Sequence, residues 1–68
     1  EFRVDENTLH CGEPLRDLKT KKNVLVVCIT KESGQEIPNG NSFFSKGDTV
    51  IVVTIKGKVI YQLNDIFE

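Results

Sequence analysis

The side chains that could perform catalysis or bind a metal are few in this chain. The one histidine, His10, is followed by Cys11, and the second cysteine is Cys28. A Cys/His pair can serve as a nucleophile and its base, but adjacent residues in a strand or turn point in different directions. A zinc site needs four ligands, often with a CxxC pair, and these residues supply at most three. The sequence therefore predicts two free thiols in a reducing compartment, no bound metal and no enzyme activity.

The lysines of the segment 19–22 are the residues best suited to contact phosphate groups. Nine basic and ten acidic residues give a formal net charge of −1, which offers no strong attraction for nucleic acid or anionic lipid. The glycines are dispersed and form neither a GxGxxG nor a P-loop pattern. Such a lysine run is ordinarily a solvated loop. A small anionic ligand at a two-fold seam is the alternative, because the seam would double the basic groups.

Length and composition indicate one small globular domain. The chain has 68 residues, of which 38% are hydrophobic and 28% charged, and a domain of this size buries only about 60% of the surface its unfolded chain exposes. No apolar run approaches the roughly 20 residues needed to cross a bilayer. Because the chain lacks methionine and opens on a strand-like segment, we expect residues 1–68 to be one domain excised from a longer protein.

Two apolar runs predict the central strands of a sheet. Val24–Ile29 and Val50–Val53 are rich in β-branched residues, short, and bounded by turn formers, which is typical of strands. Neither run alternates with polar residues, so we expect both faces of these strands to be covered. Phe2–Asp5 alternates like a half-buried strand. Gln35–Ile37 is predicted to return as a hairpin strand after a turn at Gly34 and to end before a proline.

Two short helices are predicted beside this sheet. Pro14 suits the first turn of a helix that carries Leu15 and Leu18 on one face and stops near Thr20. A second helical stripe follows Lys58 and consists of Val59, Leu63, Ile66 and Phe67. Phe43, Phe44 and Tyr61 are expected to pack inward. The fold class is α+β, with a mostly antiparallel sheet and the order β-α-β-β-β-α. Two helices can cover one face, so a homodimer is expected to cover the other.

Several segments, taken in order, resemble the C-terminal RCK domain, also called the TrkA-C domain. They are Gly12-x-Pro14-Leu15-x-x-Leu18, Asn23–Ile29, Ile37-Pro38-Asn39-Gly40 and Lys46-Gly47-Asp48-Thr49-Val50-Ile51-Val52. The ending Leu63–Glu68 also resembles the tail of TrkA-type potassium-uptake proteins. One departure concerns an arginine that family members often carry just after the first long strand, where this chain has Thr30-Lys31.

The resemblance implies a regulatory, non-catalytic domain of a cytoplasmic subunit at the inner face of the cell membrane. In that family a nucleotide-binding Rossmann domain precedes this one, and the assembly gates a membrane potassium transporter or channel. The domain dimerises, and in some members it binds cyclic di-AMP at the dimer seam. The matching ligand contacts here are Asn23, Val24 and Pro38, with Arg16 and Lys22 as phosphate partners.

Two other functions are alternatives to this expectation. A purely structural dimerisation domain would have the same fold and no ligand. An enzyme would require a polar cleft around His10 and Cys11.

Overall fold

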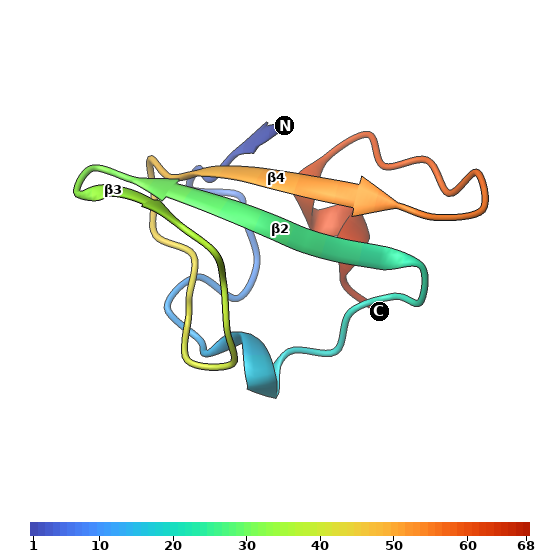
Figure 1. Ribbon diagram of the computed structural model, residues 1–68, viewed down its shortest axis with the longest axis horizontal. Coiled ribbons are helices and arrows are strands. Elements are labelled where there is room, and N and C mark those ends of the chain that lie inside the picture. Colours follow the sequence, from blue (N-terminus) through green and yellow to red (C-terminus); the bar gives the residue numbers. More distant parts are fainter.

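The computed structural model describes all 68 residues. It contains one four-stranded antiparallel sheet in the order β1-β4-β2-β3 (Figure 1). The elements are β1 (Phe2–Arg3), the 3-10 turn η1 (Leu15–Asp17), β2 (Val24–Lys31), β3 (Gly34–Glu36), β4 (Thr49–Thr54) and the 3-10 turn η2 (Leu63–Ile66). The positions of the predicted strands and the hairpin of β2 with β3 are confirmed. 3-10 turns occupy the places of both predicted helices, so the helices of the expected α+β fold are absent.

The two apolar runs form the central pair of strands, β2 and β4. Their register runs from Val24 opposite Thr54 to Thr30 opposite Thr49, with a bulge between Val26 and Cys28. The β2–β3 hairpin closes at Lys31 opposite Gly34, and Gly34 has a φ of +131°, a conformation that favours glycine. The predicted hairpin turn at Gly34 is therefore confirmed.

The helix predicted to run from Pro14 to Thr20 is wrong beyond its first turn. Only Leu15–Asp17 is helical, as a 3-10 turn, and Leu18 is already extended. The residues that would continue the helix pair instead with the end of the chain. The Glu68 amide donates to the Lys19 carbonyl at 3.0 Å, and the Lys21 amide donates to the Ile66 carbonyl at 2.7 Å. The Lys21 amide therefore cannot also donate to the Asp17 carbonyl, as a helix that continued to Lys21 would require.

The second predicted helix is likewise reduced to the 3-10 turn η2. Leu63, Ile66 and Phe67 are buried as predicted, but Val59 is 58% exposed and Tyr61 is 85% exposed, so the inward packing of Tyr61 is wrong. The carboxylate of Asp65 accepts hydrogen bonds from the amides of Tyr61 and Gln62. In this capping box Gln62 is extended and serves as the N-cap, so the turn begins at Leu63.

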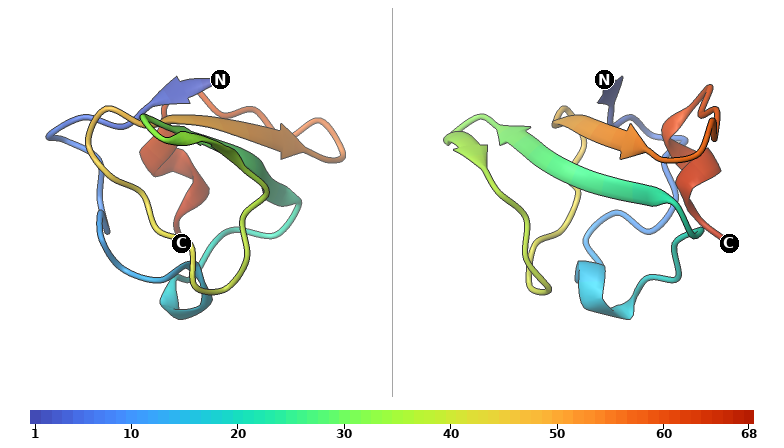
Figure 2. Two further views of the ribbon diagram at one scale, coloured as in Figure 1. Left: turned by 60° about the vertical axis from the view of Figure 1, so that its left-hand side comes forward. Right: turned by 45° about the vertical axis from the view of Figure 1, so that its right-hand side comes forward.

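The core lies on one side of the sheet only. Ile29 and Val50 point from the central strands onto Phe44 and Ile66, and all four side chains are fully buried. Both 3-10 turns and the long loops that join β1 to β2 and β3 to β4 lie on this same side (Figures 1 and 2). Phe44 is therefore a core residue as predicted, whereas Phe43 is 43% exposed. No helical segment is long and apolar enough to cross a membrane.

The opposite face of β2 and β4, here called the outer face, is apolar and open. Side chains alternate between the faces of a strand, so the neighbours of the inward residues form the pairs Leu25–Val53 and Cys28–Ile51 on the outer face. Leu25 is 58% and Val53 46% exposed. The continuous apolar runs thus reflect two apolar faces, of which the chain covers one. Covering of the outer face by a second copy stays a prediction.

We expect substitution Asp65→Ala to lower the melting temperature at neutral pH. The amide hydrogen bonds, first that of Tyr61, hold the pKa of this carboxyl below its ordinary range. A carboxyl whose pKa is lower in the folded than in the unfolded state stabilises the fold above its unfolded pKa, about 4. The difference in melting temperature between wild type and variant should therefore shrink as the pH falls through the folded pKa.

Thermal melts of both proteins across the acidic range measure this difference. The control is Glu68→Gln, which removes an exposed carboxylate outside the cap and should leave the profile of the wild type unchanged. A pH-independent difference for Asp65→Ala would contradict a role for the charge.

Candidate ligand groove

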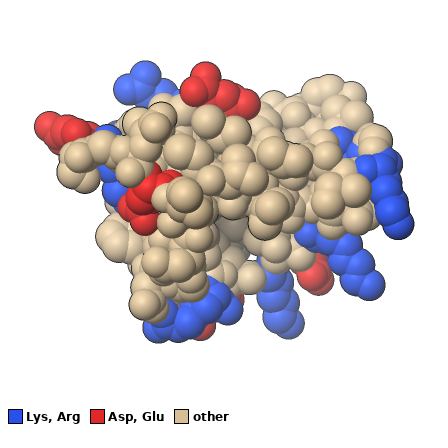
Figure 3. Space-filling view, in the orientation of Figure 1, with Lys and Arg blue, Asp and Glu red and all other residues tan.

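A mostly apolar groove of about 280 Å³ lies under the first half of β2. The core side chains Phe44, Ile66 and Phe67 line it together with Val24–Val26 of β2. Its far wall consists of Leu15, Arg16, Leu18, Thr20, Pro38, Asn39 and Gly40. We call this site the β2 groove. Figure 3 shows this side of the molecule, on which most charged side chains lie towards the edges of the view. A groove of this kind can take a flat apolar group such as a nucleobase.

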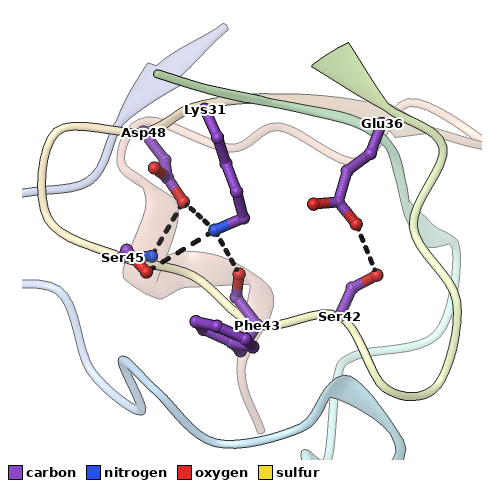
Figure 4. A network of polar contacts seen from close by, with 6 residues as sticks. All are labelled: Lys31, Glu36, Ser42, Phe43, Ser45 and Asp48. Carbon is purple, nitrogen blue, oxygen red and sulfur yellow. Dashed lines mark hydrogen bonds and ion pairs between the residues drawn. The ribbon is translucent and has the colours of Figure 1, made fainter. Parts of the chain in front are cut away.

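The turn that carries Pro38 is held in place by polar contacts. The Ser42 hydroxyl donates to a Glu36 carboxylate oxygen at 2.9 Å (Figure 4) and accepts the Asn39 amide at 2.9 Å. The Asn39 side chain accepts the Asn41 amide at 2.8 Å. Because these bonds tie both ends of the turn together, the wall of the β2 groove is formed before any ligand arrives.

Arg16 places one positive charge on the rim of the groove. Its backbone amide donates to the Gly40 carbonyl at 3.0 Å, and its guanidinium donates to the Asn41 side chain. The side chain remains 56% exposed and lies 4.0 Å from the Asp17 carboxylate. The guanidinium thus has a defined position and free donors, which is the arrangement that favours a phosphate or carboxylate ligand.

The structure brings together three of the five residues predicted to contact a ligand. Arg16, Val24 and Pro38 all line the β2 groove. Asn23 and Lys22 are exposed in the turn before β2 and do not line it. Asn23 adopts a φ of +68°, and its carbonyl accepts the Ile55 amide at 2.9 Å.

Sequence reasoning missed several wall residues of the groove. The spacing of Leu15 and Leu18 predicts only a helix face, and no local pattern marks Asn39 and Gly40 as groove residues. The groove forms because these segments meet in space, and no local pattern in the sequence reports such a meeting.

The histidine and cysteine side chains lie apart from the three hollows of the surface. The His10 ring is 2.9 Å from a Glu13 carboxylate oxygen through Nδ1 and packs edge-on against Phe67. The Cys11 thiol donates to the Thr8 carbonyl at 3.5 Å. Each side chain therefore has its own local partner, and the two are not bonded to one another. Cys11 and Cys28 are both free thiols.

Lys31, at the position of the family departure, is engaged inside the protein (Figure 4). Its Nζ donates to Asp48 Oδ2 at 2.6 Å and to the Phe43 carbonyl at 3.0 Å, and it lies 4.6 Å from the centre of the Phe43 ring. Asp48 also accepts the Ser45 amide at 2.8 Å. The lysine thereby anchors the loop 43–48 to β2 instead of facing the β2 groove.

The largest hollow, about 520 Å³, is lined by 30–33 and 45–49 and contains no hydrophobic residue. Lys31 and Asp48 face it, but they neutralise each other, so it offers a ligand neither an apolar wall nor an unpaired buried charge. The β2 groove is the better ligand site for that reason.

We expect Asp48→Ala to reduce the free energy of unfolding by about 2–3 kcal/mol, because it leaves the Lys31 ammonium without its carboxylate in a mostly buried position. The side chains of Lys31 and Asp48 are only 19% and 7% exposed. Urea denaturation measures the effect. The matched control is Glu6→Ala, which breaks the exposed pair with Lys46 and should change the free energy by less than about 1 kcal/mol. Equal losses in both variants would contradict the anchoring role of Asp48.

Comparison with curated proteins finds one informative similarity. The chain is 28% identical over 69 aligned positions to a Trk system potassium uptake protein TrkA homolog from Pyrococcus horikoshii. The alignment covers the whole of this chain and 30% of that protein. No family model matches the sequence. The chain is therefore similar, along its entire length, to a portion of a TrkA-type potassium-uptake protein.

Proposed function

We propose that this chain is a regulatory, non-catalytic domain of a potassium-uptake system that binds a small anionic effector in the β2 groove. The observation that carries the proposal is the meeting of Arg16, Val24 and Pro38 in one groove, at positions to which the TrkA-C resemblance assigns ligand contacts. The similarity to a TrkA homolog supports the link to potassium uptake.

The chemistry of the groove suits a nucleotide with phosphate and base on the same side. The apolar walls from Leu15, Leu18 and Val26 can bury a base, while the guanidinium of Arg16 pairs with a phosphate oxygen. Cyclic di-AMP contains both groups, and the family resemblance names it. We take it as the effector to be tested first, and the protein is expected to require no other cofactor.

Regulation requires a difference between states. An effector can shift a transporter or channel only if it binds one arrangement of the regulatory assembly more tightly than another. We propose a homodimer whose interface lies next to the groove, so that the bound ligand favours one relative placement of the two subunits. The domain would then act at the cytoplasmic side of the cell membrane, against a membrane potassium transporter and without contact to nucleic acid.

A structural dimerisation domain without a ligand is the second candidate. The observation that favours it is the exposed apolar outer face with Leu25 and Val53, because such a face indicates a protein partner whether or not the groove is occupied.

Titration calorimetry of the 68-residue chain with cyclic di-AMP tests the proposal. We expect one ligand per two chains, and we expect Arg16→Ala to weaken binding about tenfold or more through loss of a charge-assisted hydrogen bond. The matched control is Arg3→Ala, which removes the other arginine, located on β1 away from the groove, and should leave the affinity unchanged. A dimer that binds no cyclic di-AMP would favour the structural function.

A further inference from the structure

The lysines of the chain fall into two groups, according to whether a carboxylate pairs with them. Lys31 and Lys46 form ion pairs with Asp48 and Glu6. The other lysines form no ion pair, and they are Lys19, Lys21, Lys22, Lys56 and Lys58. Lys31 is the one lysine whose ammonium donates a hydrogen bond within the protein. The second group is therefore free to bind an external anion.

The unpaired lysines gather at one end of the molecule. The Ile55 amide donates to the Asn23 carbonyl at 2.9 Å, which places Lys22 and Lys56 side by side just beyond the central pair of strands. In Figure 3 basic side chains project from the right-hand end, where Figure 1 shows the end of β4 and the start of β2. We call the segments 19–22 and 55–61 together the lysine end.

The net charge of −1 is the sum of a positive end and a negative remainder. Residues 19–22 and 56–68 carry five lysines and the two carboxylates Asp65 and Glu68. The rest of the chain carries eight acidic and four basic side chains. The low net charge predicted no strong attraction for anionic lipid, but that prediction averages over these two parts. A molecule with this charge distribution is oriented by a negatively charged surface, with the lysine end towards it.

A tight turn presents two of these lysines to solvent. The Lys58 amide donates to the Ile55 carbonyl at 3.4 Å, and Lys56 and Gly57 have φ values of +59° and +74°. Two successive positive φ angles are typical of a type I′ β-turn. Every residue from Ile55 to Val59 is exposed, so the turn projects from the protein instead of packing against it.

Exposed apolar side chains lie beside the same turn. Ile55 is 51%, Val59 58% and Tyr61 85% exposed. Because side chains alternate along a strand, Ile55 continues the outer face beyond Val53. The Tyr61 ring is amphipathic, and such rings are enriched where a membrane meets water. Lysines and exposed apolar groups therefore occur together, which is the combination that binds the surface of an anionic bilayer.

We propose that the lysine end docks on a bilayer surface rich in anionic phospholipid. The lysines lie among the lipid phosphates, and Ile55, Val59 and Tyr61 enter the interfacial layer. A site for an acidic protein is typically built from donors in fixed positions, as an arginine fork provides. A lipid surface requires only positive charge density near apolar groups, and the unpaired lysines supply it. This contact goes beyond the proposed function, since it requires neither an effector nor a transporter.

Sedimentation of the chain with vesicles tests the role of the lysines. We expect binding to phosphatidylglycerol vesicles and none to phosphatidylcholine vesicles. Each lysine near an anionic surface contributes about fivefold to affinity, so Lys56→Gln with Lys58→Gln should weaken binding about twentyfold or more. The matched control is Arg3→Gln with Lys46→Gln, which removes the same charge from exposed positions outside the lysine end and should change the affinity less than threefold.

Tyr61 provides a direct probe of insertion. The chain contains one tyrosine and no tryptophan, so its tyrosine fluorescence reports on Tyr61 alone. We expect phosphatidylglycerol vesicles to protect this fluorescence from quenching by acrylamide, and phosphatidylcholine vesicles to give no protection.

The outcomes distinguish the lipid surface from other partners. Selective binding that is weakened only in the variant of Lys56 and Lys58, together with protection of Tyr61, supports the proposal. Equal weakening in both double variants, with native melting curves, would overturn it, as would a fully quenchable Tyr61. A wild type that ignores the vesicles and binds polyglutamate would overturn it in favour of an acidic protein. No cyclic di-AMP is present in these measurements, so their failure leaves the proposed function intact, and the reverse also holds.

Discussion

The pairing of β2 with β4 is the interaction on which the rest of the structure depends. These strands supply Ile29 and Val50 to the core and Leu25 and Val53 to the outer face. Within residues 1–68 the core covers one face of these strands, and Leu25 and Val53 on the other face are exposed. Both 3-10 turns and the long loops that join β1 to β2 and β3 to β4 lie on the core side (Figure 2). The domain therefore has a buried core on one side of the sheet and an exposed apolar surface on the other. This exposed surface is the physical basis for expecting a protein partner.

The absence of a full helix after Pro14 shapes the β2 groove. A full helix after Pro14 would have packed along the sheet, but the backbone of Lys19 and Lys21 bonds to the last residues of the chain. The first helical turn therefore stands at the groove wall with Leu15 and Arg16. Lys31 holds the loop 43–48 against the sheet from the other end of β2. The groove lies between these two anchored regions, and the first half of β2 forms its remaining wall.

This arrangement links ligand and assembly through one strand. β2 lines the groove with Val24–Val26 and presents its unpaired edge from the same residues. A ligand that contacts these side chains and Arg16 would touch the same strand whose Leu25 is exposed on the outer face. Its binding energy could then favour one dimer geometry, as regulation by population shift requires. The polar hollow beside Lys31 has no such link, because its charges are already paired.

The sequence by itself determined where the strands lie along the chain, whereas their order in the sheet came from the structure. Runs of β-branched residues between turn formers specify strands by local chemistry, and Gly34 specifies its turn through a conformation that other residues avoid. The 3-10 turn in place of the first predicted helix could not be foreseen, since the spacing of Leu15 and Leu18 suits an α-helix and a 3-10 turn equally. The structure shows the chain after this turn bonded to the end of the chain, through Lys21 to Ile66 and Lys19 to Glu68, and these tertiary contacts lie outside any local pattern. Three residues of the groove, Arg16, Val24 and Pro38, were predicted as ligand contacts, and only through the family resemblance. Its shape depended on tertiary structure because segments far apart in the chain form it, and no local pattern encodes their contact.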